Sequence, residues 1–158
     1  MRRYGPLIAV GDALVVGDPG RHHLRLTNDG VIRREGAENR GILPWDRVQG
    51  ITLHVPTTRF RLPGLLGTVV LGALTALALA DLGIDPDDGS VTLRVEGEAQ
   101  TSPLSRHHVG GYWAPTVTGA HLLLAHLLAH PEQRALLVHP ERLIEIAATL
   151  ARSGAASV

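Results

Sequence analysis

The residues in this sequence that are best suited to chemistry are its histidines, of which there are nine among 158 residues. His126 and His130 are four positions apart, so on a helix they share one face, and Glu132 follows them. Zinc binds such donors, but a metal site needs a third strong ligand, and His121 lies on the opposite side of an ideal helix from His130. We therefore expect no metal and no cofactor, and we rank a histidine-dependent metalloenzyme last among three candidate functions.

The segment RHHVGGYWAPT, residues 106–116, brings together a second group of such side chains. Arg106, Tyr112 and Trp113 flank a Gly-Gly pair, in a chain with only five Phe, Trp and Tyr residues. Arginine and aromatic side chains on a loop are enriched in binding surfaces, and on this interpretation all three are candidate interaction residues. The favoured alternative is that the two aromatic residues are buried and anchor the following helix to the sheet.

The composition of the chain removes several classes of function. There is no cysteine, which excludes disulfides, thiol catalysis and cysteine-based zinc sites and fits the reducing cytoplasm. No P-loop, dinucleotide fingerprint or serine nucleophile elbow occurs, so we predict that the protein is not an enzyme. The formal net charge is zero and no dense basic stripe is present, so we expect no nucleic-acid partner.

An uncharged run at residues 62–80 is the most unusual feature of the sequence. As a helix, residues 64–80 would be about 26 Å long, slightly short of the ~30 Å hydrocarbon core of a bilayer. Small side chains recur at every fourth position, which would let another helix backbone approach closely. These candidate contact residues are Gly64, Thr68, Gly72, Ala76 and Ala80.

Topology favours a contact between copies of the chain over a membrane span. A single crossing would separate the strands before residue 61 from the strand at 91–95, and we expect all of them in one sheet. A helix that is apolar on every side must be buried, so we predict a homo-oligomer with residues 62–82 in the contact. Another protein is the alternative partner. Membrane association through 62–82 stays open as the second interpretation, and a short strand at 68–71 as a third.

The elements on either side of this run predict one domain, 1–158, of the α+β class. Alternating apolar and polar residues predict several antiparallel strands within 20–61 and 89–105. An Asn-Asp-Gly sequence at 28–30 predicts a tight turn in a hairpin, because these residues tolerate positive φ.

Helices are predicted for the other segments of the chain. Residues 62–84 are predicted as an apolar helical insertion, and residues 115–152 as C-terminal helices. Within the latter, His-Pro-Glu occurs twice, starting at His130 and at His139, and each occurrence predicts a helix start with Pro in the first turn and Glu near the positive end of the dipole.

One part of the chain, about residues 24–55, resembles the start of bacterial pleckstrin-homology-like (PH-like) domains. The resemblance rests on a Leu-Thr-x-x-Gly-hydrophobic hairpin and a Pro-Trp-Asp-x-hydrophobic corner, here Leu26, Thr27, Gly30, Val31, Pro44, Trp45, Asp46 and Val48. It implies a strongly bent antiparallel sheet or small barrel closed by C-terminal helices. Such domains bind lipids, proteins or their own copies, so the resemblance implies a fold and not a function. The phosphoinositide-binding pattern of eukaryotic relatives needs basic residues in the early hairpin loop, and residues 28–30 are not basic.

The sequence thus predicts a non-catalytic, cytoplasmic module for protein interaction and self-association, with a PH-like fold. A membrane-associated protein that uses residues 62–82 as an anchor is the second hypothesis.

Overall fold

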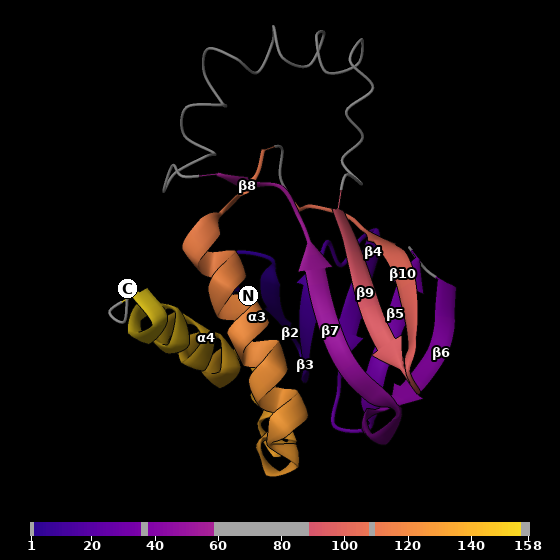
Figure 1. Cartoon of the computed structure of the whole chain (residues 1–158). Helices are drawn as coiled ribbons and strands as arrows, with labels where there is room; N and C mark the ends of the chain where they lie inside the picture. The colour runs from indigo at the N-terminus through magenta and orange to yellow at the C-terminus, as the bar shows by residue number, and fades with distance from the viewer. Residues whose placement is uncertain (1, 36–37, 59–88, 108–109, 156–158) are drawn as a thin grey trace, which may run out of the picture.

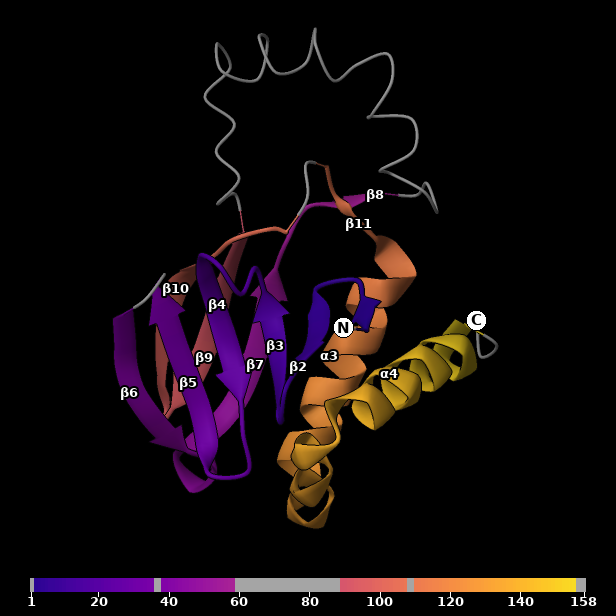
Figure 2. The same cartoon turned by 180° about the vertical axis from the view of Figure 1, so that it is seen from behind.

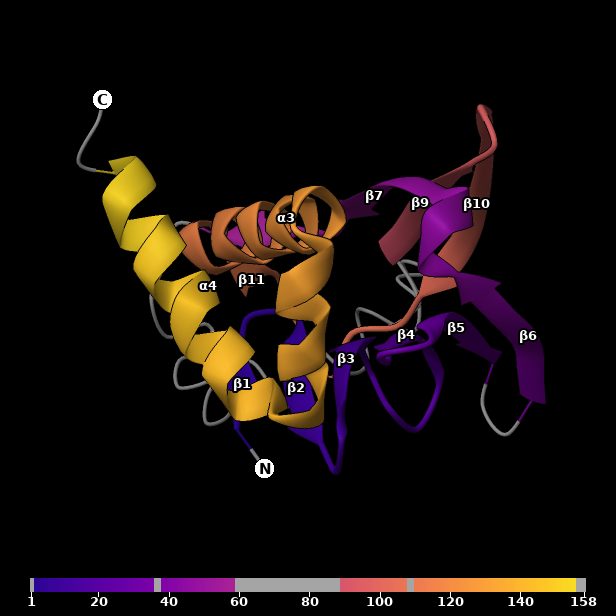
Figure 3. The same ribbon diagram turned by 90° about the horizontal axis from the view of Figure 1, so that it is seen from below.

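The structure is a computed structural model that describes residues 2–35, 38–58, 89–107 and 110–155. The described part belongs to the α+β class, as the sequence predicts. Two antiparallel sheets lie beside a group of helices, and a small parallel pair of strands lies at one end (Figures 1 and 3).

The first sheet is an antiparallel meander of six strands that follow one another in chain order. They are β1 (Arg3–Tyr4), β2 (Leu7–Val10), β3 (Ala13–Gly17), β4 (His22–Leu26), β5 (Gly30–Glu35) and β6 (Glu38–Pro44). Between β4 and β5, Thr27 and Gly30 exchange two backbone hydrogen bonds, which confirms the predicted hairpin turn. Gly30 is needed there because a Cβ at this position would collide with the Leu43 carbonyl oxygen.

The second sheet contains β7 (Val48–His54), β9 (Gly89–Val95) and β10 (Glu98–Leu104), in the order β10-β9-β7. A short 3-10 helix, η1 (Trp45–Arg47), turns the chain from β6 into this sheet. Trp45 is 5% exposed, and its Nε1 donates a hydrogen bond of 2.8 Å to the Thr27 carbonyl oxygen. The Pro-Trp-Asp corner is therefore tied to the preceding hairpin turn.

Apolar side chains from both sheets meet in one hydrophobic cluster, which the helices also join. At one end of the sheets, the Ser105 N–H donates to the His22 carbonyl oxygen and the Asp18 N–H to the Ser105 carbonyl oxygen, each at 2.9 Å. These bonds tie the end of β10 to the turn between β3 and β4 (Figure 2). Among the described strands they do not continue as a ladder, so the two sheets stay open and are not closed into the small barrel that the resemblance allowed.

The C-terminal part of the chain forms α3 (Ala114–Ala129), the 3-10 helix η2 (Pro131–Val138) and α4 (Pro140–Ala155). This confirms helices over 115–152, with the difference that the first His-Pro-Glu sequence starts a 3-10 helix. α3 packs on β7 and against α4, and α4 also covers β2. Where α3 and α4 cross, a Cβ on Gly119 would lie 2.6 Å from the Ala147 carbonyl oxygen, so glycine permits the close approach of the helices.

Candidate interaction site

The two strands that flank the apolar run are hydrogen-bonded neighbours. β7 and β9 pair in antiparallel register, with Thr52 opposite Thr92 and His54 opposite Ser90. The chain therefore leaves β7 and enters β9 at the same end of the sheet (Figure 1). This confirms that the strand directly before the run, β7, shares a sheet with β9. The prediction of a single sheet for all the strands before residue 61 is wrong, because β4, β5 and β6 belong to the other sheet.

The run itself lies outside the described residues. This holds for the proposed contact segment 62–82 and for the insertion 62–84 that contains it. The candidate contact residues in it are Gly64, Thr68, Gly72, Ala76 and Ala80.

Close to this end of the sheet, β8 (Thr57–Thr58) pairs in parallel with β11 (Tyr112–Trp113). The Tyr112 N–H donates to the Pro56 carbonyl oxygen at 2.8 Å. Because α3 begins directly after β11, this pair holds the start of the helix beside the chain that leaves β7. Trp113 is partly buried and occupies the N-cap position of α3.

Tyr112 is buried, with 2% of its surface exposed. Its hydroxyl forms a hydrogen bond of 3.1 Å with His107 Nδ1, and the two rings are 5.3 Å apart. Burial raises the pKa of Tyr112 to about 12, because the phenolate would lose its hydration. This environment agrees with the anchoring interpretation of Tyr112 that the sequence favoured.

Arg106, the third candidate of this segment, is also buried, with 8% of its surface exposed. Its guanidinium donates a hydrogen bond of 3.0 Å to the Gly110 carbonyl oxygen. The three candidates thus lie close together, with Arg106 and Tyr112 inside the fold and Trp113 partly accessible.

The histidines of α3 and its end lie in two separate places. His121 accepts a hydrogen bond from the Leu53 backbone N–H, with 3.0 Å between Leu53 N and His121 Nε2. The rings of His126 and His130 lie at the end of α3 with centroids 4.4 Å apart and their planes tilted by 39°, and His130 Nδ1 lies 3.3 Å from a Glu132 carboxylate oxygen. In the part of the chain that the structure describes, no three potential ligand residues gather to hold a metal ion.

Arg134 has a structural role that the sequence analysis missed. Its guanidinium donates to the carbonyl oxygens of Leu127 and Leu128 at 2.8 and 3.1 Å, and it lies 5.0 Å from the centre of the Trp45 ring. One side chain thus joins the end of α3 to the corner between the sheets. The signal in the sequence is weak: a basic residue shortly after a predicted helix end, where it can meet unpaired carbonyl groups.

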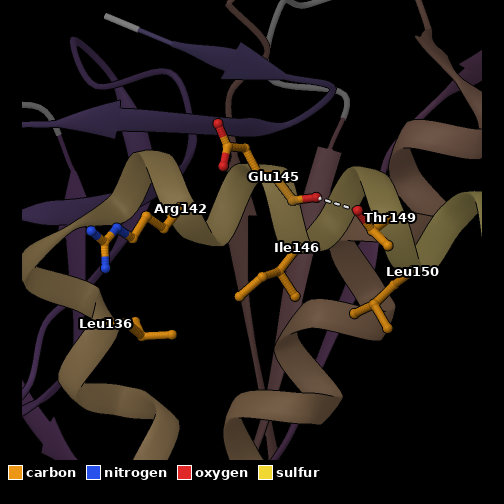
Figure 4. Close-up of a pocket in the computed structure, with 6 residues that line it drawn as sticks. All are labelled: Leu136, Arg142, Glu145, Ile146, Thr149 and Leu150. Carbon is orange, nitrogen blue, oxygen red and sulfur yellow. Dashed lines mark hydrogen bonds between the residues drawn. The ribbon is translucent and has the colours of Figure 1, made fainter.

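A surface groove between η2 and α4 was also missed. It has a volume of about 490 Å³ and is lined by Leu136, Arg142, Glu145, Ile146, Thr149 and Leu150. In Figure 4 the side chains of Leu136, Ile146 and Leu150 line one side of α4, and Glu145 points away from them. The usable signal was the spacing of residues 142, 146 and 150, which share one face of a helix.

Within residues 2–35, 38–58, 89–107 and 110–155, no helix is long and apolar enough to cross a membrane. Comparisons with protein-family models, with curated proteins and with solved structures give no match to this chain. The PH-like resemblance therefore stays a prediction from the hairpin and corner residues.

Proposed function

We propose that this chain is a non-catalytic, cytoplasmic module for protein interaction that associates with copies of itself through residues 62–82. The observation that carries the proposal is the pairing of β7 with β9, in which His54 lies opposite Ser90. The chain leaves β7 and enters β9 at one end of their sheet. The uncharged run in the sequence between these strands must find an apolar partner. A second copy of the chain supplies one.

The roles of the polar side chains support the non-catalytic part of the proposal. His121 accepts a hydrogen bond from the backbone of β7, Arg106 donates one to the Gly110 carbonyl oxygen, and the Tyr112 hydroxyl bonds to His107. A catalytic acid or base must reach a substrate, whereas these groups are directed at the protein itself.

The PH-like fold is part of the same proposal. It is supported by the β4–β5 hairpin, by the Trp45 corner that leads into a second sheet, and by α3, which packs against that sheet. A crystal structure tests it: its strands and α3 should superpose on a PH-like domain with the same chain direction throughout.

The pairing of the strands also limits the membrane alternative. A single crossing between β7 and β9 would place His54 and Ser90 on opposite sides of the bilayer although they are paired. Two helical crossings need about 40 residues, at roughly 20 for each span. Residues 59–88 are too few for that. The membrane hypothesis is then limited to a segment that lies at the surface of one leaflet and does not cross the bilayer.

Sedimentation velocity of the full chain in detergent-free buffer tests the proposal. We expect a concentration-dependent dimer or higher oligomer, which Gly72→Leu weakens because leucine fills the stripe of small side chains. Leu74→Met is the matched control: it keeps a large apolar side chain and should leave the association unchanged. A monomer at every concentration, or flotation with lipid vesicles without any oligomer in solution, contradicts self-association.

A further inference from the structure

The helix α3 differs from an ordinary surface helix because its exposed face carries no charge. It contains no Asp, Glu, Lys or Arg at any of its positions. By contrast α4, which also lies at the surface, exposes Glu141, Arg142 and Glu145. A helix without charge on any face is normally covered on all sides, so we expect the exposed face of α3 to have a partner.

The exposed residues of α3 form one stripe along the helix. Positions 118, 122, 125 and 129 follow one another at intervals of three or four, so they share a single face. This α3 stripe consists of Thr118, Leu122, Ala125 and Ala129, and 38% of the Leu122 surface is exposed. Small side chains around one leucine let the backbone of a partner approach closely.

A groove between α3 and β7 widens this uncharged surface. It has a volume of about 470 Å³ and is lined by Gln49, Gly50, Ile51, Thr52, Ala125, Leu128 and Ala129. None of these lining residues is charged, and the groove shares Ala125 and Ala129 with the α3 stripe. A charged partner would lose its hydration on this surface without gaining an ion pair, so the surface fits an uncharged partner.

The sequence contains one other long segment of the same character. Residues 62–80 and 107–131 are its two longest stretches without Asp, Glu, Lys or Arg, and the second of them contains α3. The strand that precedes the uncharged run, β8, pairs with β11, and α3 begins directly after β11 (Figure 1). The run therefore follows, in the sequence, a strand that lies at the end of α3 where the stripe begins.

We infer that the α3 stripe is the surface that receives residues 62–82 of a second copy of the chain. This contact rests on the proposed function, because it names the surface to which the run binds. Both partners are uncharged where they meet, so neither leaves an unpaired charge in the contact. In a twofold dimer each copy supplies one run and one stripe, and an axis near the β8–β11 pair brings each run to the stripe of the other copy.

A charge placed in the stripe tests this contact in the full chain by sedimentation equilibrium. We expect Ala125→Glu to raise the dissociation constant about tenfold or more, because the new carboxylate would lose its hydration in an uncharged contact. Ala99→Glu is the matched control: it makes the same substitution at an exposed position of β10, outside this surface, and should leave the dissociation constant unchanged. Circular dichroism of both variants confirms that these exposed substitutions leave the fold intact.

Cross-linking identifies the two partners directly, and the absence of cysteine from the chain gives a clean background. Chains with Ala125→Cys are mixed with chains that carry Gly72→Cys, treated with a short bismaleimide, and the linked peptides are identified by mass spectrometry. We expect dimers in which one variant is joined to the other, and none when Ala99→Cys replaces Ala125→Cys. A chain with both Ala125→Cys and Gly72→Cys that is linked only within itself would place the run on its own stripe and would contradict the contact.

The outcomes separate this contact from the proposed function. If the chain associates and Ala125→Glu leaves its dissociation constant unchanged, the α3 contact is wrong although self-association stands. If the original chain is a monomer at every concentration, the proposed function and this contact are both wrong. If that monomer floats with lipid vesicles and Ala125→Glu abolishes the flotation, the stripe meets lipid and both are again wrong.

Discussion

His121 of α3 accepts a hydrogen bond from the backbone N–H of Leu53 in β7, with 3.0 Å between Leu53 N and His121 Nε2. In the described part of the second sheet β7 is an edge strand, since its ladder partner is β9 alone. A buried N–H on such an edge needs an acceptor, and the imidazole supplies it. The bond also requires Nε2 to be unprotonated, so the histidine acts here as a neutral structural group.

Replacing His121 by alanine should lower the free energy of unfolding by about 1–2 kcal/mol, because the Leu53 N–H loses its acceptor in a partly buried place. Urea denaturation followed by circular dichroism measures the change. His121→Gln, whose side-chain carbonyl can accept the same bond, should recover part of the loss. His126→Ala, on the same helix, is the control; an effect as large as that of His121→Ala would contradict this role.

The ionisation of Tyr112 gives a second test of the interior. Its pKa is raised to about 12, above the ordinary value of 10, so the folded state favours the neutral phenol. The sign follows from this: the fold is unaffected below pH 10 and loses stability as the pH rises from 10 towards 12. Absorbance titration of a Tyr4→Phe variant, which leaves Tyr112 as the single tyrosine, should show tyrosinate near pH 12. A midpoint near 10 in the folded protein would show that the ring is hydrated.

Gly119→Ala tests the crossing of α3 and α4. In an unhindered helix this change is favourable by about 1 kcal/mol. Here the new Cβ would lie 2.6 Å from the Ala147 carbonyl oxygen and 3.1 Å from the Ala151 Cβ, so the helices must separate. We expect a net loss of about 1–3 kcal/mol in thermal or urea unfolding. Thr118→Ala, at the exposed neighbouring position, should change stability by less than about 0.5 kcal/mol. A stabilising Gly119→Ala would contradict the close packing.

Arg134→Lys tests the link between α3 and the Trp45 corner. Lysine keeps the charge but cannot donate two bonds in the fork geometry that reaches the Leu127 and Leu128 carbonyl oxygens. We expect about 1–2 kcal/mol of destabilisation. In a Trp113→Phe background, fluorescence of Trp45 should shift to the red as its cover loosens. If Arg134→Lys leaves both the stability and the Trp45 emission unchanged, Arg134 does not link α3 to the Trp45 corner.

Strands with one buried and one exposed face were predictable from the sequence. β7 and β9 alternate between buried and more exposed residues along their length, and the Asn-Asp-Gly turn marked the β4–β5 hairpin. β3 carries no such alternation, because all five of its residues, Ala13–Gly17, are buried. A strand covered on both faces has no period of two, so pattern analysis did not assign it.

Long-range relationships could not be predicted from local pattern. The β8–β11 pair joins Thr57 to Tyr112, far apart in the chain, and rests on backbone hydrogen bonds that any residue can make. The placement of His121 opposite Leu53 likewise depends on how α3 packs against β7. For the candidate site, residue types alone identified Arg106, Tyr112 and Trp113, but their burial depends on that packing.

The central claim is that the chain associates with itself, and sedimentation equilibrium of the full chain in detergent-free buffer over a wide range of concentration tests it most directly. We predict a reversible dimer or higher oligomer whose dissociation constant rises in Gly72→Leu and stays unchanged in Leu74→Met. A single monomeric species at every concentration would contradict the account.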